Sequence, residues 1–389
     1  MKPMKKYFLI FIITGLAFSL PHIGHTSKKH VLPTMYAFLD RIMKISPEIY
    51  DETIFTSPKK REDVEQTLLE LRVLSKKLKQ HKGLQTPGYE VTADYFIDNI
   101  QQVHESYRDG NRKYAQRLFR STLHACSHCH TQESSNRNMR WDFSQFQLPK
   151  KPIDQASFYY TIRKYAPAWD LFSKVVQTYG KDHKNKKNLE TALNRLLTIS
   201  LRVDRKPQKM VTFLNNLNNK REMLPYFQSL IKSWTKELTN LQKNKNTAQL
   251  LEKKAPYFSN AVDLLYRDIF PFPKDGRSGR VVMEYVTGIM FEYVNKHPKN
   301  PPQKILYWLG ISNLSLDKFE SSIIGVKFLE KCIDNYKMTP VSNSCFDALE
   351  EHWVLGFSGS SGIKLPIDLQ DILRAYRKKL NVEQPWLNY

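Results

Sequence analysis

Residues 111–130 read NRKYAQRLFRSTLHACSHCH, and this stretch decides the fold of the N-terminal part of the chain. Its apolar and small side chains recur every three or four residues, which is the period of an amphipathic α-helix. The same face continues into the last five residues, CSHCH, where Cys126, Cys129 and His130 lie about one helical turn apart. The sequence therefore predicts a helix whose inward face ends in two thiols and an imidazole.

Three segments before residue 111 have the same helical period. Pro33 is expected to open the first of them, because a proline in the first turn loses no backbone hydrogen bond. Four amphipathic helices with mostly short connections pack most simply as an antiparallel four-helix bundle, here over residues 31–132. The three apolar stripes are Leu32, Met35, Leu39, Ile42 and Met43; Val64, Leu68, Leu71, Leu74 and Leu78; and Phe96, Ile100, Val103 and Tyr107.

Residues 133–152 are polar and contain proline, which predicts a linker, and residues 153–389 return to a helical pattern in shorter pieces. Two of these pieces, residues 164–176 and 305–333, resemble weak tetratricopeptide repeats, which are helix hairpins with small residues at fixed places. No 34-residue self-similarity runs through the whole region. We expect an all-α chain that ends in a degenerate array of helical hairpins, with a non-repetitive helical domain as the alternative. The matching positions are Ala168, Phe172 and Val175, and then Leu309, Gly310, Gly325 and Cys332.

The chain opens with MKPMKKYFLIFIITGLAFSLPHIG, in which three lysines precede a short apolar run. Small residues at Ala17 and Ser19 follow in the arrangement of a cleavage site, so residues 1–19 are predicted to be a secretory signal peptide, with cleavage as late as about residue 27. We expect a periplasmic or secreted protein. The alternative is an uncleaved N-terminal anchor that holds the protein at the membrane.

A net charge of +22 favours acidic partners. Because an exported chain does not meet nucleic acid, we expect an acidic partner protein or peripheral contact with an anionic membrane surface, and no nucleic acid. Cys332 and Cys345 lie in a region of neighbouring helices, and thiols oxidise outside the cytoplasm. They are predicted to form a disulfide, the alternative being two buried thiols.

Three chemistries use a C-x-x-C pair such as Cys126 and Cys129: zinc binding, dithiol redox exchange and covalent haem attachment. A structural zinc site needs four closely spaced ligands, and the second cysteine pair is far along the chain with a different spacing. A redox dithiol normally begins a helix after a strand, whereas this pair ends a helix. Haem attachment fits, because one helical face presents both thiols to a porphyrin edge and His130 to the iron.

With these elements, residues 31–132 resemble the class II c-type cytochromes, the cytochrome c-prime group, which are four-helix bundles with one haem near the end of the last helix. The resemblance implies one covalent haem c, with Cys126 and Cys129 as thioether attachment points and His130 as the proximal iron ligand. In that group a residue of the first helix faces the other side of the haem, so Met35 or Met43 is the expected distal ligand. The long C-terminal helical region departs from the group.

The predicted function is an exported monohaem c-type cytochrome that transfers single electrons and docks a redox partner protein on its helical array. One alternative is a haem-based gas-binding or sensing protein with an open distal site, and another is an interaction scaffold. We do not expect an enzyme. The chain has no second C-x-x-C-H, P-loop, dinucleotide fingerprint, HExxH or nucleophile elbow.

Overall fold

The computed structural model describes residues 26–133, 147–179, 183–218, 223–243, 257–267, 279–316, 322–336, 338–360 and 362–382. Over these residues the chain forms seventeen α-helices and one minimal β-hairpin, which confirms the predicted all-α class. Within the same ranges, no helix combines the length and the apolar character that crossing a bilayer requires. The predicted signal peptide, residues 1–19, lies outside the described residues, as does most of the predicted linker.

Four long helices lie where the sequence predicts them, and two single-turn helices connect the first to the second. Short 3₁₀ turns, η1 (Pro58–Lys60) and η2 (Lys82–Leu84), precede the second and third long helices. Gly110, with φ +90°, turns the chain between the last two long helices. The helices are α1 (Thr26–Lys44), α2 (Ser46–Ile49), α3 (Glu52–Phe55), α4 (Arg61–Lys79), α5 (Pro87–Arg108) and α6 (Arg112–His130).

Contacts between the long helices fix their directions. The middle of α1 meets the residues just after α4, where Thr34 Oγ1 lies 3.2 Å from His81 Nε2, and Arg41 near the end of α1 pairs with Glu70 in the middle of α4. Lys79 Nζ, at the end of α4, pairs with Asp94 near the start of α5 at 3.0 Å. Because Thr92 Oγ1 on α5 lies 2.8 Å from Cys129 Sγ on α6, the CSHCH stretch sits at this same end. Consecutive long helices are therefore antiparallel.

Two details of α1 correct the sequence-based expectation. The helix begins at Thr26, so Pro33 lies inside it and does not open it; a proline beyond the first turn removes a backbone hydrogen bond but here does not end the helix. Leu32 is 50% exposed, and the inward stripe begins one turn later at Met35 and continues through Phe38.

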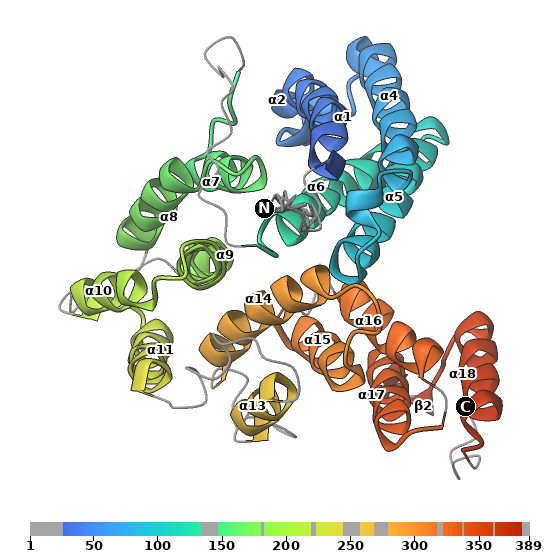
Figure 1. The fold of residues 1–389 in the computed structure, drawn as a ribbon. Coiled ribbons are helices and arrows are strands. Elements are labelled where there is room, and N and C mark those ends of the chain that lie inside the picture. Colours follow the sequence, from blue (N-terminus) through green and yellow to red (C-terminus); the bar gives the residue numbers. More distant parts are fainter. Residues whose placement is uncertain are drawn as a thin grey trace, which may run out of the picture.

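The rest of the chain is a series of helices that pack mainly on their sequence neighbours. Figure 1 shows them following one another along an arc whose open side is occupied by the N-terminal helices. The arc contains α7 (Pro152–Thr161), α8 (Tyr165–Tyr179), α9 (Lys186–Thr198), α10 (Pro207–Asn218), α11 (Pro225–Lys243), α13 (Tyr257–Arg267), α14 (Arg280–Lys296), α15 (Gln303–Leu316), α16 (Ser322–Asn335), α17 (Pro340–Gly356) and α18 (Ile367–Leu380).

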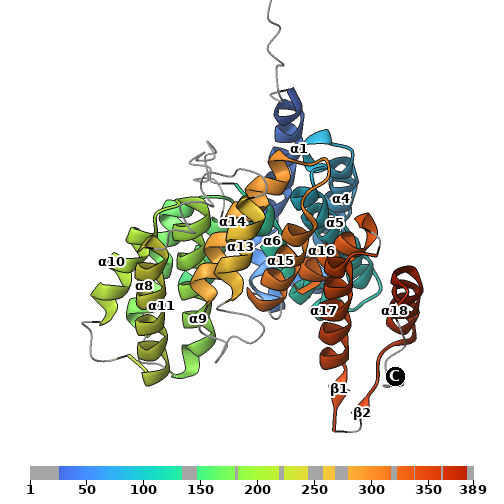
Figure 2. The same cartoon turned by 60° about the horizontal axis from the view of Figure 1, so that its bottom comes forward.

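Irregular elements interrupt the array, the series of helices from α7 to α18, at a few points. A 3₁₀ turn, η3 (His183–Asn185), precedes α9, and a π-helical turn, η4 (Ile199–Val203), continues it. Two-residue strands β1 (Ser358–Gly359) and β2 (Gly362–Ile363) pair antiparallel beyond α17, where Figure 2 shows them projecting from the rest of the molecule. Cys332 on α16 and Cys345 on α17 form a disulfide with a Cα–Cα distance of 6.4 Å, the pairing expected from the sequence.

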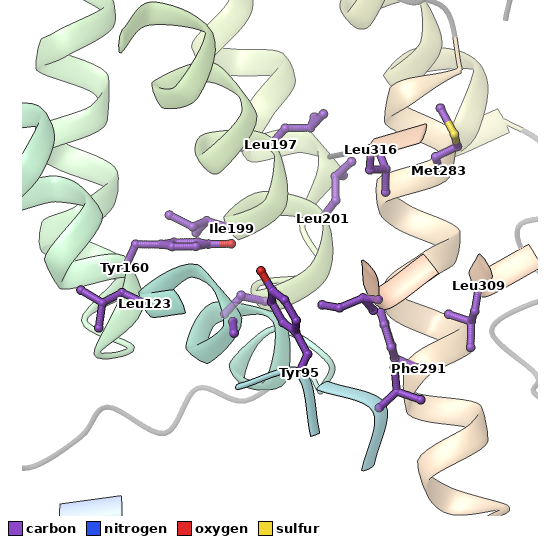
Figure 3. Packing of buried hydrophobic residues seen from close by; sticks show 14 of the residues in the cluster. Tyr95, Leu123, Tyr160, Leu197, Ile199, Leu201, Met283, Phe291, Leu309 and Leu316 are labelled. Atoms are coloured by element: carbon purple, nitrogen blue, oxygen red, sulfur yellow. The ribbon is translucent and has the colours of Figure 1, made fainter. Parts of the chain in front are cut away.

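The N-terminal helices and the array share one apolar core. Helix α5 packs on both α14 and α16, and α6 packs on α7. Figure 3 shows Tyr95 of α5, Tyr160 of α7 and Phe291 of α14 in the same cluster of buried side chains. The end of α6 therefore lies between the two parts of the chain and not at a free end of the N-terminal helices.

Candidate cofactor site

The CSHCH stretch forms the last turn of α6. Cys126, Cys129 and His130 are partly exposed, whereas Ala125, Ser127 and His128 are buried. Both thiols are free. The helix thus presents the two thiols and one imidazole from a turn whose other sides are packed.

Cys129 faces α5. Its Sγ lies 2.8 Å from Thr92 Oγ1, and Gln132 Nε2, just beyond α6, donates to the same hydroxyl oxygen at 3.2 Å. Gln132 Oε1 in turn accepts from Asn295 Nδ2 of α14 at 2.9 Å. The side of the site nearest Cys129 is therefore fixed by hydrogen bonds that join α5, α6 and α14.

Cys126 faces the connection between α2 and α3 and the start of α7. The Arg120 guanidinium lies 5.1 Å from the centre of the Tyr50 ring and donates to Asp154 Oδ1 at 2.8 Å. Burial raises the pKa of Tyr50, the nearby Arg120 charge lowers it, and Asp154 raises it. This second side of the site thus combines an aromatic ring with a paired cation and carboxylate.

Both thiols are held in the protonated form. Burial raises the pKa of Cys126 to about 12, and the neighbouring Cys129 adds to the shift. Burial also raises the pKa of Cys129 to about 11, although the hydrogen bond with Thr92 acts in the opposite direction. A redox dithiol needs an easily ionised cysteine, so these environments disfavour dithiol redox chemistry.

His130 is held by the turn between α7 and α8. Its Nδ1 lies 3.1 Å from the Thr161 carbonyl oxygen, and Tyr165 Oη donates to the carbonyl oxygen of His130 at 3.3 Å. Burial and the Arg163 charge lower the pKa of His130 to about 3, so its imidazole is neutral. A neutral imidazole whose Nδ1–H donates to a carbonyl leaves Nε2 as a metal ligand, and the backbone contact fixes the ring orientation.

The two candidate methionines of α1 lie at different heights. Phe38 on α1 contacts Phe96 on α5, with ring centroids 5.4 Å apart, and Thr92 lies one turn before Phe96. Met35, nearly one turn before Phe38, is therefore at the height of the Thr92–Cys129 contact and packs partly buried against the core. Met43 is buried roughly 12 Å further along the helix axis. Of the two, Met35 is the one placed near the level of the CSHCH stretch.

The donor set fits covalent haem. Two protonated thiols one turn apart are suited to add to vinyl groups, and the neutral His130 is suited to ligate iron. Across the part of the chain that the structure describes, no group of three or more His, Cys, Asp or Glu side chains could hold a metal ion by itself.

Sequence patterns did not reveal Thr161, Arg163 or Tyr165, because they lie in a turn outside the predicted bundle. No known protein family, characterised protein or solved structure matches the chain. The residues of the site therefore provide the functional evidence.

Proposed function

We propose that this protein is an exported monohaem c-type cytochrome that transfers single electrons. The observation that supports it best is the last turn of α6, where two protonated thiols stand beside a neutral imidazole whose Nδ1 lies 3.1 Å from a backbone carbonyl. Covalently bound haem supplies a one-electron iron couple.

The chain's own residues have distinct roles in this proposal. Cys126 and Cys129 would hold the haem through thioethers, each thiol adding S and H across one vinyl group. His130 would ligate the iron, with its orientation set by Thr161. Met35 is the candidate for the distal position, and a thioether ligand there would favour electron transfer over gas binding.

The helical array serves to dock the redox partner. The net charge of +22 favours an acidic protein, and it also allows peripheral contact with an anionic membrane surface. We expect binding of such a partner to weaken steeply between low and physiological salt, because exposed charges are screened over about 8–10 Å there.

The first test is spectroscopy of the full-length protein expressed with a c-type maturation system. We expect a pyridine haemochrome spectrum of c type and covalent haem that survives denaturation. A Cys126→Ser, Cys129→Ser double variant should lose the covalent haem, whereas a Cys332→Ser, Cys345→Ser variant should keep it as the matched control. A colourless wild-type protein would refute the proposal.

The same sample separates electron transfer from gas binding. A low-spin reduced spectrum that carbon monoxide does not change indicates a ligand on both sides of the iron. A high-spin spectrum that shifts with carbon monoxide would favour the gas-binding alternative.

A further inference from the structure

The turn between α7 and α8 is built around a residue in an unfavourable backbone conformation. Arg163 has φ +65°, in the left-handed region that glycine occupies most easily. The turn is closed by two backbone hydrogen bonds, from Lys164 N to Tyr159 O at 2.8 Å and from Arg163 N to Tyr160 O at 3.2 Å. Helices often end in this way with glycine, and an arginine in this conformation is less favourable.

The residues two positions before and two positions after Arg163 contact the CSHCH stretch. Thr161 O lies 3.1 Å from His130 Nδ1, and Tyr165 Oη lies 3.3 Å from His130 O. Arg163 is thus held between the two contacts that fix His130, and its own side chain hydrogen-bonds to Tyr165. The turn places a guanidinium beside the candidate iron ligand.

Arg163 also lies close enough to Tyr89 on α5 to affect its pKa. Burial raises the pKa of Tyr89, as do Glu133 and Cys129, whereas the Arg163 charge acts in the opposite direction. Arg163 therefore acts electrostatically on groups of α5, α6 and α8 around one end of the site. Glu133, which hydrogen-bonds to Tyr89, brings a carboxylate to the same cluster.

We propose, building on the proposed function, that Arg163 is a positioning residue of the cofactor site, which holds His130 through Tyr165 and whose positive charge raises the reduction potential of the haem. That positive charge disfavours the oxidised, more positive iron. The C-terminal array thus completes the cofactor site and sets the potential of the electron carrier.

The test compares midpoint potentials of full-length variants at fixed pH and ionic strength. Arg163→Gly removes the charge and suits the backbone conformation, whereas Arg163→Lys keeps the charge and the backbone cost. Arg374→Gln removes an equal charge from an exposed site on α18, where the side chain is 58% exposed, and is the matched control.

For Arg163→Gly we expect the reduced-to-oxidised ratio at a fixed electrode potential to fall about tenfold, the size expected of one charge roughly 12 Å away at an effective dielectric constant of ~20. That shift is ~59 mV for a one-electron couple. Arg163→Lys should recover most of the wild-type potential, and Arg374→Gln should leave it unchanged.

The outcomes separate the two proposals. If the wild-type protein carries covalent haem and Arg163→Gly leaves the potential unchanged, the role of Arg163 is refuted and the cytochrome proposal stands. If the potential of Arg163→Lys falls as far as that of Arg163→Gly, a positive charge at this position does not set the potential and the charge assignment is wrong. A wild-type protein without haem would refute the cytochrome proposal itself.

Discussion

At the scale of single residues, His124 is predicted to make folding sensitive to acid. Arg195 Nη2 lies 2.8 Å from His124 Nδ1, so the imidazole accepts the hydrogen bond in its neutral form. Burial and the charges of Arg195 and His128 lower its pKa well below 6.5. Below about pH 6.5 the unfolded chain binds a proton at His124 that the folded chain does not, so this contribution is present above that pH and is lost as the pH falls.

We therefore expect the stability of the wild-type protein, relative to a His124→Gln variant, to fall by up to ~1.4 kcal/mol per pH unit below pH 6.5. Urea denaturation of both proteins between pH 7.5 and 4.5 measures this difference, and other titrating groups cancel in the comparison. A constant difference across the range would show that folded His124 accepts a proton as readily as unfolded His124.

The candidate site illustrates what a sequence reveals about single residues. Cys126, Cys129 and His130 were predicted as a group, because they are close in sequence and on one helical turn. Thr161 and Tyr165 contact His130 from 31 and 35 residues away in the sequence. No periodic pattern encodes such contacts, since they depend on how α6 and α7 pack.

At the scale of elements, the crossing of α15 and α16 depends on two glycines. A Cβ built on Gly325 would lie 2.8 Å from the carbonyl oxygen of Gly310 and 2.7 Å from Leu314 Cγ. Because the carbonyl oxygen belongs to the backbone of α15, the two helices would have to separate. We expect Gly325→Ala to lower the free energy of unfolding by about 1–3 kcal/mol in urea denaturation.

Gly356, the last residue of α17, provides the control. No atom lies within 4 Å of a Cβ built there. Gly356→Ala should therefore be neutral or stabilise the protein by about 0.5–1 kcal/mol, because alanine favours the helix. A Gly325→Ala variant as stable as Gly356→Ala would mean that the helices do not cross as closely as the structure shows.

Helix periodicity located the four long N-terminal helices, since a stripe of apolar residues over several turns is a strong signal. It missed α2 and α3, because four residues are too few to show a period. It also placed Pro33 at a helix start, whereas α1 begins at Thr26 and continues through Pro33. A helix was therefore predictable where its own apolar stripe extends over several turns, and not where it is a single turn.

At the scale of the whole molecule, Asn295 on α14 joins the array to the N-terminal helices. Its Oδ1 accepts from Thr86 Oγ1 at 2.7 Å and from Gly88 N at 3.1 Å, and its Nδ2 donates to Gln132 Oε1 at 2.9 Å. The side chain of Thr86 does not cap α5, so Asn295 supplies the acceptor for the first turn of that helix. Together with the shared apolar core, this contact predicts that both parts of the chain unfold as one unit.

All six tryptophans follow residue 140, so tryptophan fluorescence reports on the C-terminal part, whereas far-ultraviolet circular dichroism also reports on α1 to α6. We expect the two urea transitions to coincide, and Asn295→Ala to move both midpoints down together, with a loss of about 1–3 kcal/mol. Lys296→Ala, which removes a side chain that is 58% exposed and ion-paired with Glu292, should change stability by at most ~0.5 kcal/mol. Two separate transitions, with Asn295→Ala shifting one alone, would instead mean that the N-terminal helices and the array fold independently.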